Sequence, residues 1–159
     1  MSFELINIGI ADLGVGKSPS ILRTILGSCI GICIYDTSTR IGGLSHIMLP
    51  TSKKNAANPR KYADSAIPLL VEDMMRAGAM RNSMIAKIIG GAAMFKHTEN
   101  SFMGDIGRNN IVSVQQILSG MNLRIVSSDV GGDYGRTIDF YLESGEVKIK
   151  TIGRDTKII

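Results

Sequence analysis

Two isoleucine-rich segments separated by a short polar stretch constrain the fold of this chain more than any other feature. Residues 28–35 and 41–49 are rich in β-branched side chains, and residues 36–40 between them read Asp-Thr-Ser-Thr-Arg. Runs of β-branched residues favour strands, and Asp, Ser and Thr favour turns because their side chains bond to nearby backbone groups. The pattern therefore predicts a β-hairpin.

The register of this hairpin decides which side chains share a face. With Thr37 and Ser38 at the centre of the turn, Cys29 is predicted to lie directly opposite His46. A shift by one residue would send His46 to the other face. The chosen register separates an apolar face from a face that carries Cys29, His46 and two glycines. The apolar side chains are those of Ile30, Ile32, Ile34, Ile41, Ile47 and Leu49, and the glycines are Gly31 and Gly42.

Shorter patterns predict the rest of the fold. Asn58 followed by Pro59 is typical of a helix start, and this helix is expected to stop at Gly78. Residues 110–118 show the apolar spacing of a second helix. Residues between the first strand and the hairpin are interpreted as a loop. Because strands outnumber helices and hairpins recur, we expect an α+β fold with largely antiparallel sheet. The further strands are predicted over residues 4–11, 86–89, 124–128, 137–142 and 146–152.

Composition and charge narrow the class of protein. The length of 159 residues fits one domain, 1–159. The composition, with 44% hydrophobic and 20% charged residues, is typical of a globular protein. A net charge of +4 without a Lys/Arg tract argues against nucleic-acid binding. No apolar run reaches the roughly 20 residues that span a bilayer, and no export leader is visible. We therefore expect a cytoplasmic protein with reduced cysteines and no membrane insertion.

Cys29 and His46 are the residues that can carry chemistry. A cysteine becomes a nucleophile when a histidine withdraws its proton, since the thiolate attacks. Backbone N–H groups around Gly27 and Ser28 can hold an oxyanion. A third side chain should orient the imidazole, and Thr24, Ser28 and Ser45 are all candidates.

A structural interpretation competes with this one. A buried cysteine is often a small apolar side chain, and a histidine on a strand often only forms structural hydrogen bonds. Cys33 is interpreted in this way, as packing. The two cysteines have no second Cys/His pair beside them, so no metal site is expected.

Several multi-residue motifs then carry a family resemblance. Residues 24–29 read Thr-Ile-Leu-Gly-Ser-Cys, and residues 42–46 read Gly-Gly-Leu-Ser-His. With residues 62–68, 90–95, 106–109 and 129–136, they extend in order over nearly the whole chain. Together they resemble the CheD family of bacterial chemoreceptor glutamine deamidases.

The resemblance implies a cysteine–histidine hydrolase that converts selected glutamines of chemotaxis receptors to glutamate through a thioester, without a cofactor. It implies Cys29 as nucleophile, His46 as general base and a threonine shortly upstream as third member. Thr24 is the nearest threonine, and Arg23 is an alternative occupant of that position. The implied fold is layered α+β, with mixed sheets and flanking helices, similar to the catalytic cores of deamidase toxins.

Two other functions compete with the deamidase. The resemblance also implies binding to a CheC-type phosphatase, so the chain can instead be a regulatory binding module. A general cysteine peptidase is disfavoured because the chain lacks a second lobe to clamp an extended backbone. Receptor contacts are considered for Arg108, Arg136 and a basic cluster, against solvated or structural roles for the same residues. The cluster comprises Lys53, Lys54, Arg60 and Lys61, and His97 is expected to be solvated.

Overall fold

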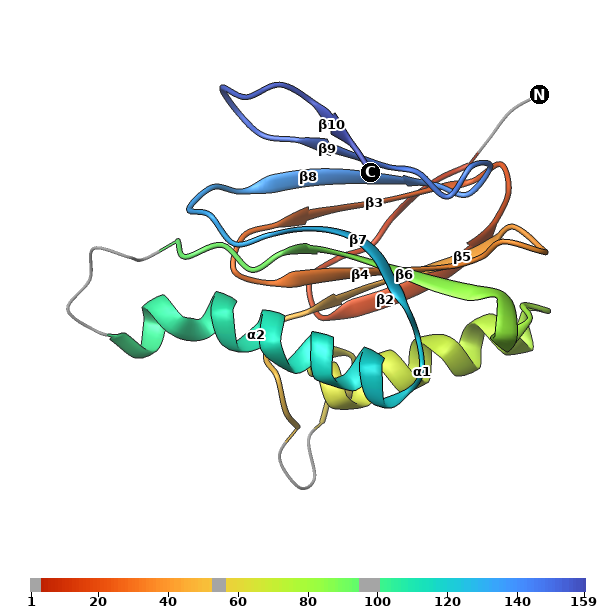
Figure 1. Ribbon diagram of the computed structural model, residues 1–159, viewed down its shortest axis with the longest axis horizontal. Coiled ribbons are helices and arrows are strands. Elements are labelled where there is room, and N and C mark those ends of the chain that lie inside the picture. Colours follow the sequence, from red (N-terminus) through yellow and green to blue (C-terminus); the bar gives the residue numbers. More distant parts are fainter. Residues whose placement is uncertain (1–3, 53–56, 95–100) are drawn as a thin grey trace.

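The computed structural model describes residues 4–52, 57–94 and 101–159, with side chains in the last segment described from Asp105 onward. The described chain forms two five-stranded sheets and two α-helices (Figure 1). Sheet A has the order β1-β3-β8-β9-β10, and sheet B has the order β2-β5-β4-β6-β7. The strands of sheet A are β1 (Leu5–Asn7), β3 (Ile21–Leu26), β8 (Arg136–Tyr141), β9 (Val147–Lys150) and β10 (Lys157–Ile158). Those of sheet B are β2 (Asp12–Lys17), β4 (Ile30–Asp36), β5 (Ile41–Ile47), β6 (Met84–Gly90) and β7 (Ile125–Val130), and the helices are α1 (Ala63–Arg76) and α2 (Ser101–Gly120).

Sheet B is the middle of three layers. Sheet A covers one of its faces, and α1 and α2 cover the other (Figure 1). Both β4 and β5 are buried along their whole length, because sheet A covers one face of sheet B and the helices cover the other. Gly42 and Gly43 permit this close packing. A Cβ at Gly42 would lie 2.4 Å from a Leu142 carbon in the core under sheet A, and one at Gly43 would lie 2.5 Å from a Leu70 carbon of α1.

The predicted hairpin is confirmed, but its predicted register is wrong by two residues. His46 pairs with Gly31, not with Cys29, and Tyr35 pairs with Gly42. A two-residue shift preserves the alternation of side chains. The isoleucines therefore share one face as predicted, and the structure packs this face against the helices. Cys29 and His46 still belong to the opposite face of sheet B.

The turn chemistry of Asp36 explains the shift. Its carboxylate accepts hydrogen bonds from the Ser38 backbone N–H at 2.9 Å, the Ser38 hydroxyl at 2.7 Å and the Thr39 hydroxyl at 2.6 Å. The Arg40 N–H donates to the Asp36 carbonyl at 2.9 Å, with Arg40 in the left-handed region at φ 59°. These bonds centre the turn on Ser38 and Thr39.

Two strands occupy the segment that the sequence predicted as a loop. β2 pairs with β5, and β3 pairs in parallel with β1 and antiparallel with β8. The glycines of β2 weaken its strand pattern, and β3 gains most of its pairing from β8, more than 100 residues away in the chain. Non-local pairing of this kind leaves little local signal.

The remaining elements follow the prediction in type. Asn58 caps a short 3-10 turn (Pro59–Lys61) rather than an α-helix, and α1 then begins at Ala63 and ends before Gly78 at φ 108°. The second predicted helix is the latter part of α2. The ladders β1–β3 and β6–β7 are parallel and the others antiparallel. The fold is thus α+β with two mixed sheets, and its similarity to deamidase toxins stays a prediction.

Within the described part of the chain, neither helix is long and apolar enough to cross a bilayer.

Candidate active site

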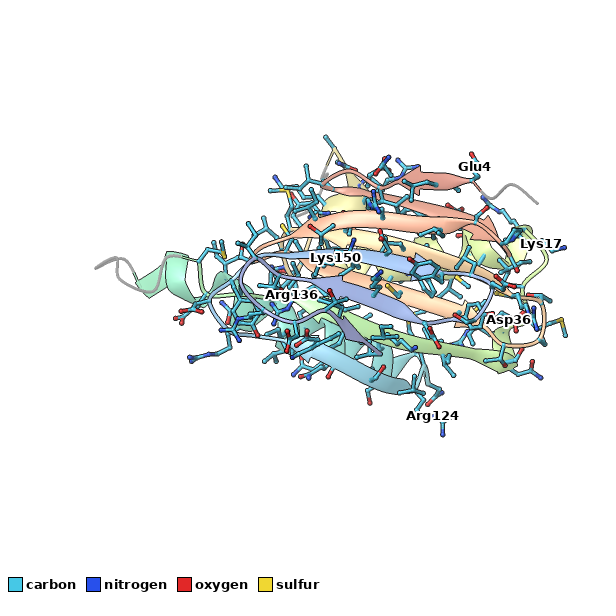
Figure 2. The ribbon with its side chains drawn as sticks, turned by 90° about the horizontal axis from the view of Figure 1, so that it is seen from above. Glu4, Lys17, Asp36, Arg124, Arg136 and Lys150 are labelled. Carbon is cyan, nitrogen blue, oxygen red and sulfur yellow. The ribbon has the colours of Figure 1, made fainter. Side chains whose placement is uncertain are left out.

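A cavity of about 510 Å³ brings together the three residues that the sequence analysis placed at a reactive centre. Thr24 enters it from β3, His46 from β5, and Cys29 from the loop that precedes β4. Its remaining walls come from residues 7–10, Arg23, Ile25, Gly27, Ser28 and Met94. The hairpin turn at Asp36 lies at the opposite end of β4 from this cavity, and Figure 2 shows Asp36 at one end of the strands.

The loop that carries Cys29 is held by backbone hydrogen bonds from the end of β6. The Gly91 N–H donates to the Cys29 carbonyl at 2.9 Å, and the Ala92 N–H donates to the Gly27 carbonyl at 3.0 Å. Gly90 adopts φ 112°, and a Cβ there would lie 2.3 Å from the Cys29 carbonyl oxygen. Only glycine allows this approach, which gives a structural reason for the Gly90-Gly91 pair.

The Cys29 side chain is half-buried. Burial raises the pKa of its thiol above the ordinary value, because the low-dielectric surroundings disfavour the thiolate. The resting side chain is therefore a thiol at neutral pH, and its activation needs a base.

His46 supplies a base with a defined tautomer. Its Nδ1 lies 2.7 Å from Thr24 Oγ1, and that hydroxyl donates its single proton to the Ile8 carbonyl at 2.8 Å. Thr24 Oγ1 can therefore only accept from His46, so Nδ1 carries the proton and Nε2 is the basic nitrogen. Nε2 is buried and has no hydrogen-bond partner. Burial lowers the pKa of His46 to about 4, so the imidazole is neutral at physiological pH.

Strand alternation separates Thr24 from Arg23. Thr24 is buried and contacts His46, whereas Arg23 forms a two-bond ion pair with Asp139, Nε to Oδ1 at 2.6 Å and Nη2 to Oδ2 at 2.9 Å. Adjacent residues of a strand point to opposite faces. Of these two candidates, Thr24 is the one that contacts the imidazole.

Of the other predicted site residues, some line the cavity and one does not. Gly27 and Ser28 line the cavity. Ser45 pairs with Ile32 in the face that packs against the helices, so it is not brought to the cavity and its predicted place there is corrected. Its position next to His46 on a strand forces this, since the two side chains must diverge.

Three exposed apolar side chains surround the cavity. Ile10, Ile25 and Met94 are 59%, 70% and 46% exposed, and all three line the cavity. Local pattern does not reveal them: Ile10 lies in the turn between β1 and β2, within a predicted strand, and Ile25 lies in β3, within a predicted loop. Together they form an exposed apolar rim around the cavity.

The remaining residues for which the sequence suggests a role lie away from this cavity or outside the described residues. Cys33 is fully buried in the core between the sheets, where burial raises its pKa, so its interpretation as packing is confirmed. Arg136 is 1% exposed and faces Asp129, which disfavours receptor contact. Arg108 is exposed, and Arg60 lies 3.6 Å from Asp12. Lys53, Lys54 and His97 lie outside the described residues.

Comparison with known proteins identifies the family of the chain. Residues 48–151 match the family model described as CheD chemotactic sensory transduction. Proteins named "Probable chemoreceptor glutamine deamidase CheD" from Caldanaerobacter subterraneus subsp. tengcongensis and Clostridium botulinum strain Hall are 44% and 48% identical, each over the full length of both chains.

Two solved structures are similar in fold alone. Bacillus licheniformis hypothetical protein YfiH superposes with a TM-score of 0.51 at 15% identity, and Neisseria meningitidis protein NMB0706 with 0.54 at 9% identity. The matches cover 76% and 82% of this chain, which spans 51% and 64% of those two proteins. The full-length relatives and the family model agree, and the chain belongs to the CheD family.

Proposed function

We propose that this chain is a chemoreceptor glutamine deamidase, which hydrolyses the side-chain amide of selected receptor glutamines to glutamate with Cys29 as nucleophile. The proposal rests on the geometry of the His46 imidazole. Its Nδ1 contacts Thr24 and its Nε2 has no hydrogen-bond partner, and both His46 and Cys29 line the cavity. The relatives' name supplies the substrate class. Residues 1–159 would act as one domain on the cytoplasmic part of the receptors.

The first half of the reaction forms a thioester. His46 Nε2 takes the Cys29 proton as the sulfur attacks the amide carbonyl of the glutamine. Backbone N–H groups of the loop at residues 27–29 stabilise the oxyanion. The imidazolium then protonates the leaving nitrogen, and ammonia departs. Thr24 keeps the ring in place by accepting from Nδ1 throughout.

The second half regenerates the enzyme. His46 Nε2 takes a proton from water, the resulting nucleophile attacks the thioester carbonyl, and the proton returns to the Cys29 sulfur as it leaves. One water is consumed, and one amide becomes one carboxylic acid and ammonia. Neither half calls for a metal or an organic cofactor.

Mass spectrometry of a receptor cytoplasmic fragment tests the proposal. Wild type should replace specific glutamine amides by acids, and Cys29→Ala should not. Cys33→Ala is the matched control, because it removes the other thiol, which lies in the core between the sheets. Modification that persists in Cys29→Ala, or a fragment that binds wild type and stays unmodified, would contradict the proposal.

The exposed apolar residues around the cavity also favour a regulatory interaction. A CheC-type phosphatase that covers Ile10, Ile25 and Met94 would block access to Cys29 and control deamidation. Ile25→Asp should weaken binding to the purified phosphatase because it places a charge in an apolar contact, whereas Cys29→Ala should bind normally. Binding that is unchanged by Ile25→Asp would exclude this surface as the contact.

A further inference from the structure

Asn110 is a fully buried side chain of α2 that touches both segments of the candidate active site. Its Nδ2 lies 3.1 Å from the Ser28 carbonyl oxygen and 2.9 Å from the Met48 carbonyl oxygen. Ser28 directly precedes Cys29, and Met48 follows His46 by two residues. A single amide group therefore donates both of its protons, one to the loop that carries Cys29 and one to the segment directly after β5, the strand that carries His46.

The two Asn110 hydrogen bonds lie just beyond the end of the β4–β5 ladder. The ladder between β4 and β5 has Ile30 opposite Ile47 as its pair nearest the cavity. Beyond it the strands separate, because the Met48 and Leu49 N–H groups donate to the Lys61 carbonyl, at 2.8 and 3.2 Å. The Asn110 amide thus joins the two strands where their own ladder has ended, close to Cys29.

Burial of an amide in this position is costly. Asn110 Oδ1 has no hydrogen-bond partner, although the side chain is enclosed. An apolar residue would pack in the helix without this desolvation cost. Asn110 differs from such an apolar residue in the two hydrogen bonds that its Nδ2 donates.

We propose that Asn110 is a positioning residue, which fixes the Cys29 loop relative to the end of the His46 strand and so sets where the thiol lies with respect to Nε2. This inference rests on the proposed deamidase function and extends it to a residue of α2. Asn110 does not act on the substrate itself, because it acts through the Ser28 and Met48 carbonyl groups.

Deamidation kinetics of Asn110→Ala and Asn110→Asp test the proposal. Asp keeps the size of the side chain but replaces the donating amide by an acceptor that faces two carbonyl oxygens. Both variants should lower kcat by about 10- to 100-fold, because a small misplacement of reacting groups has effects of this size. KM should stay near the wild-type value. Asn109→Ala is the control, since Asn109 is the exposed neighbour on the same helix.

A second measurement needs no receptor. Alkylation of Cys29 by chloroacetamide is followed at pH 7 and pH 10 in Cys33→Ala protein, at a temperature where each variant is folded by circular dichroism. At pH 7 alkylation depends on His46 as base, and at pH 10 it depends much less on it. The ratio of the two rates should fall several-fold in both Asn110 variants and stay unchanged in Asn109→Ala.

The two measurements separate the possible failures. If the Asn110 variants only melt at lower temperature, with kcat and the alkylation ratio unchanged, the positioning role is wrong and Asn110 is structural. If wild type does not deamidate the receptor, the proposed function fails, and a reduced alkylation ratio would still support the positioning of Cys29 by Asn110.

Discussion

At the scale of single residues, the reactivity of this chain depends on a pair of uncharged partners. Burial raises the pKa of Cys29 and lowers that of His46 to about 4, so neither group is ionised near pH 7. A preformed thiolate–imidazolium pair is therefore not the resting state. In the proposed mechanism, proton transfer occurs during attack on the substrate, and its pH dependence follows from these two shifts.

We expect kcat/KM for deamidation to be flat between about pH 5 and 8, because the essential base is neutral and the thiol protonated throughout this window. It should fall only below about pH 5, as His46 becomes protonated. Iodoacetamide alkylation of Cys29 should still rise above about pH 8.5, the ordinary pKa of a free cysteine. An alkylation plateau below pH 7 would indicate a resting ion pair and contradict this prediction.

Thr24 should matter through its oxygen. Thr24→Val keeps the shape but removes the acceptor for His46 Nδ1, so the ring loses its tautomer preference and orientation. We expect kcat to drop at least about 10-fold, and Thr24→Ser, which keeps the hydroxyl, to recover most of it. Equal kcat values for Val and wild type in steady-state assays would exclude the orienting role.

At the scale of elements, the β4–β5 hairpin is anchored at the end far from the cavity by Asp36. Burial by itself would raise the pKa of this carboxyl, but hydrogen bonds from the Met80 N–H and from Ser83, Thr39 and Ser38 hold it well below the ordinary value. The Met80 bond, at 2.7 Å, connects the hairpin turn to the segment between α1 and β6. Asp36 thereby sets the register that places His46 on the same face as Cys29.

Asp36→Asn should lower the free energy of unfolding at pH 7 by about 2 kcal/mol, the size expected for hydrogen bonds to a charged group. Because the folded-state pKa is depressed, the stabilisation is present above about pH 4 and is lost as the pH falls through the folded-state value. The difference between variant and wild type in urea unfolding should therefore shrink below about pH 4. Glu143→Gln, an exposed control, should show no such difference, and a gap that stays constant down to pH 2 would contradict the assignment.

At the scale of the whole molecule, a buried ion pair links the two sheets near the active site. Arg136 of β8 lies opposite Leu26, the last residue of β3 before the Cys29 loop. Figure 2 labels Arg136 on sheet A. Its Nη2 is 3.6 Å from Asp129 Oδ1 of β7, and the guanidinium nitrogens have no hydrogen-bond partner. The Tyr134 ring lies 4.6 Å from the guanidinium carbon.

Removal of the two charges should have opposite effects. Asp129→Asn leaves a buried cation without this counter-ion and should destabilise the fold by about 3 kcal/mol. Arg136→Met replaces the cation by an apolar side chain of similar length and should be neutral or stabilising. Lys157→Ala, which removes a cation that is mostly exposed and also 3.6 Å from Asp129, should change stability by less than about 1 kcal/mol in urea unfolding. A strongly destabilised Arg136→Met would instead show that the charge itself holds the sheets together.

Features that depend on local pattern can be predicted from the sequence. The hairpin, both helices, the α+β class and the shared face of Cys29 and His46 follow from alternation and turn chemistry. The shared face survived a wrong register because side chains alternate with a period of two, so a two-residue shift changes the partners and not the faces.

Features that depend on pairing between distant segments emerge only in the folded chain. β3 was missed because its main partner, β8, lies more than 100 residues along the chain. The contact of Thr24 with His46 depends on that strand, since its alternation aims Thr24 at the imidazole and Arg23 away from it. The contacts of Asn110 with Ser28 and Met48 were equally hidden, because they join α2 to residues 62 and 82 positions away. The sequence pattern of a strand predicts which of its faces a side chain occupies. The residues that the side chain contacts depend on how the layers pack.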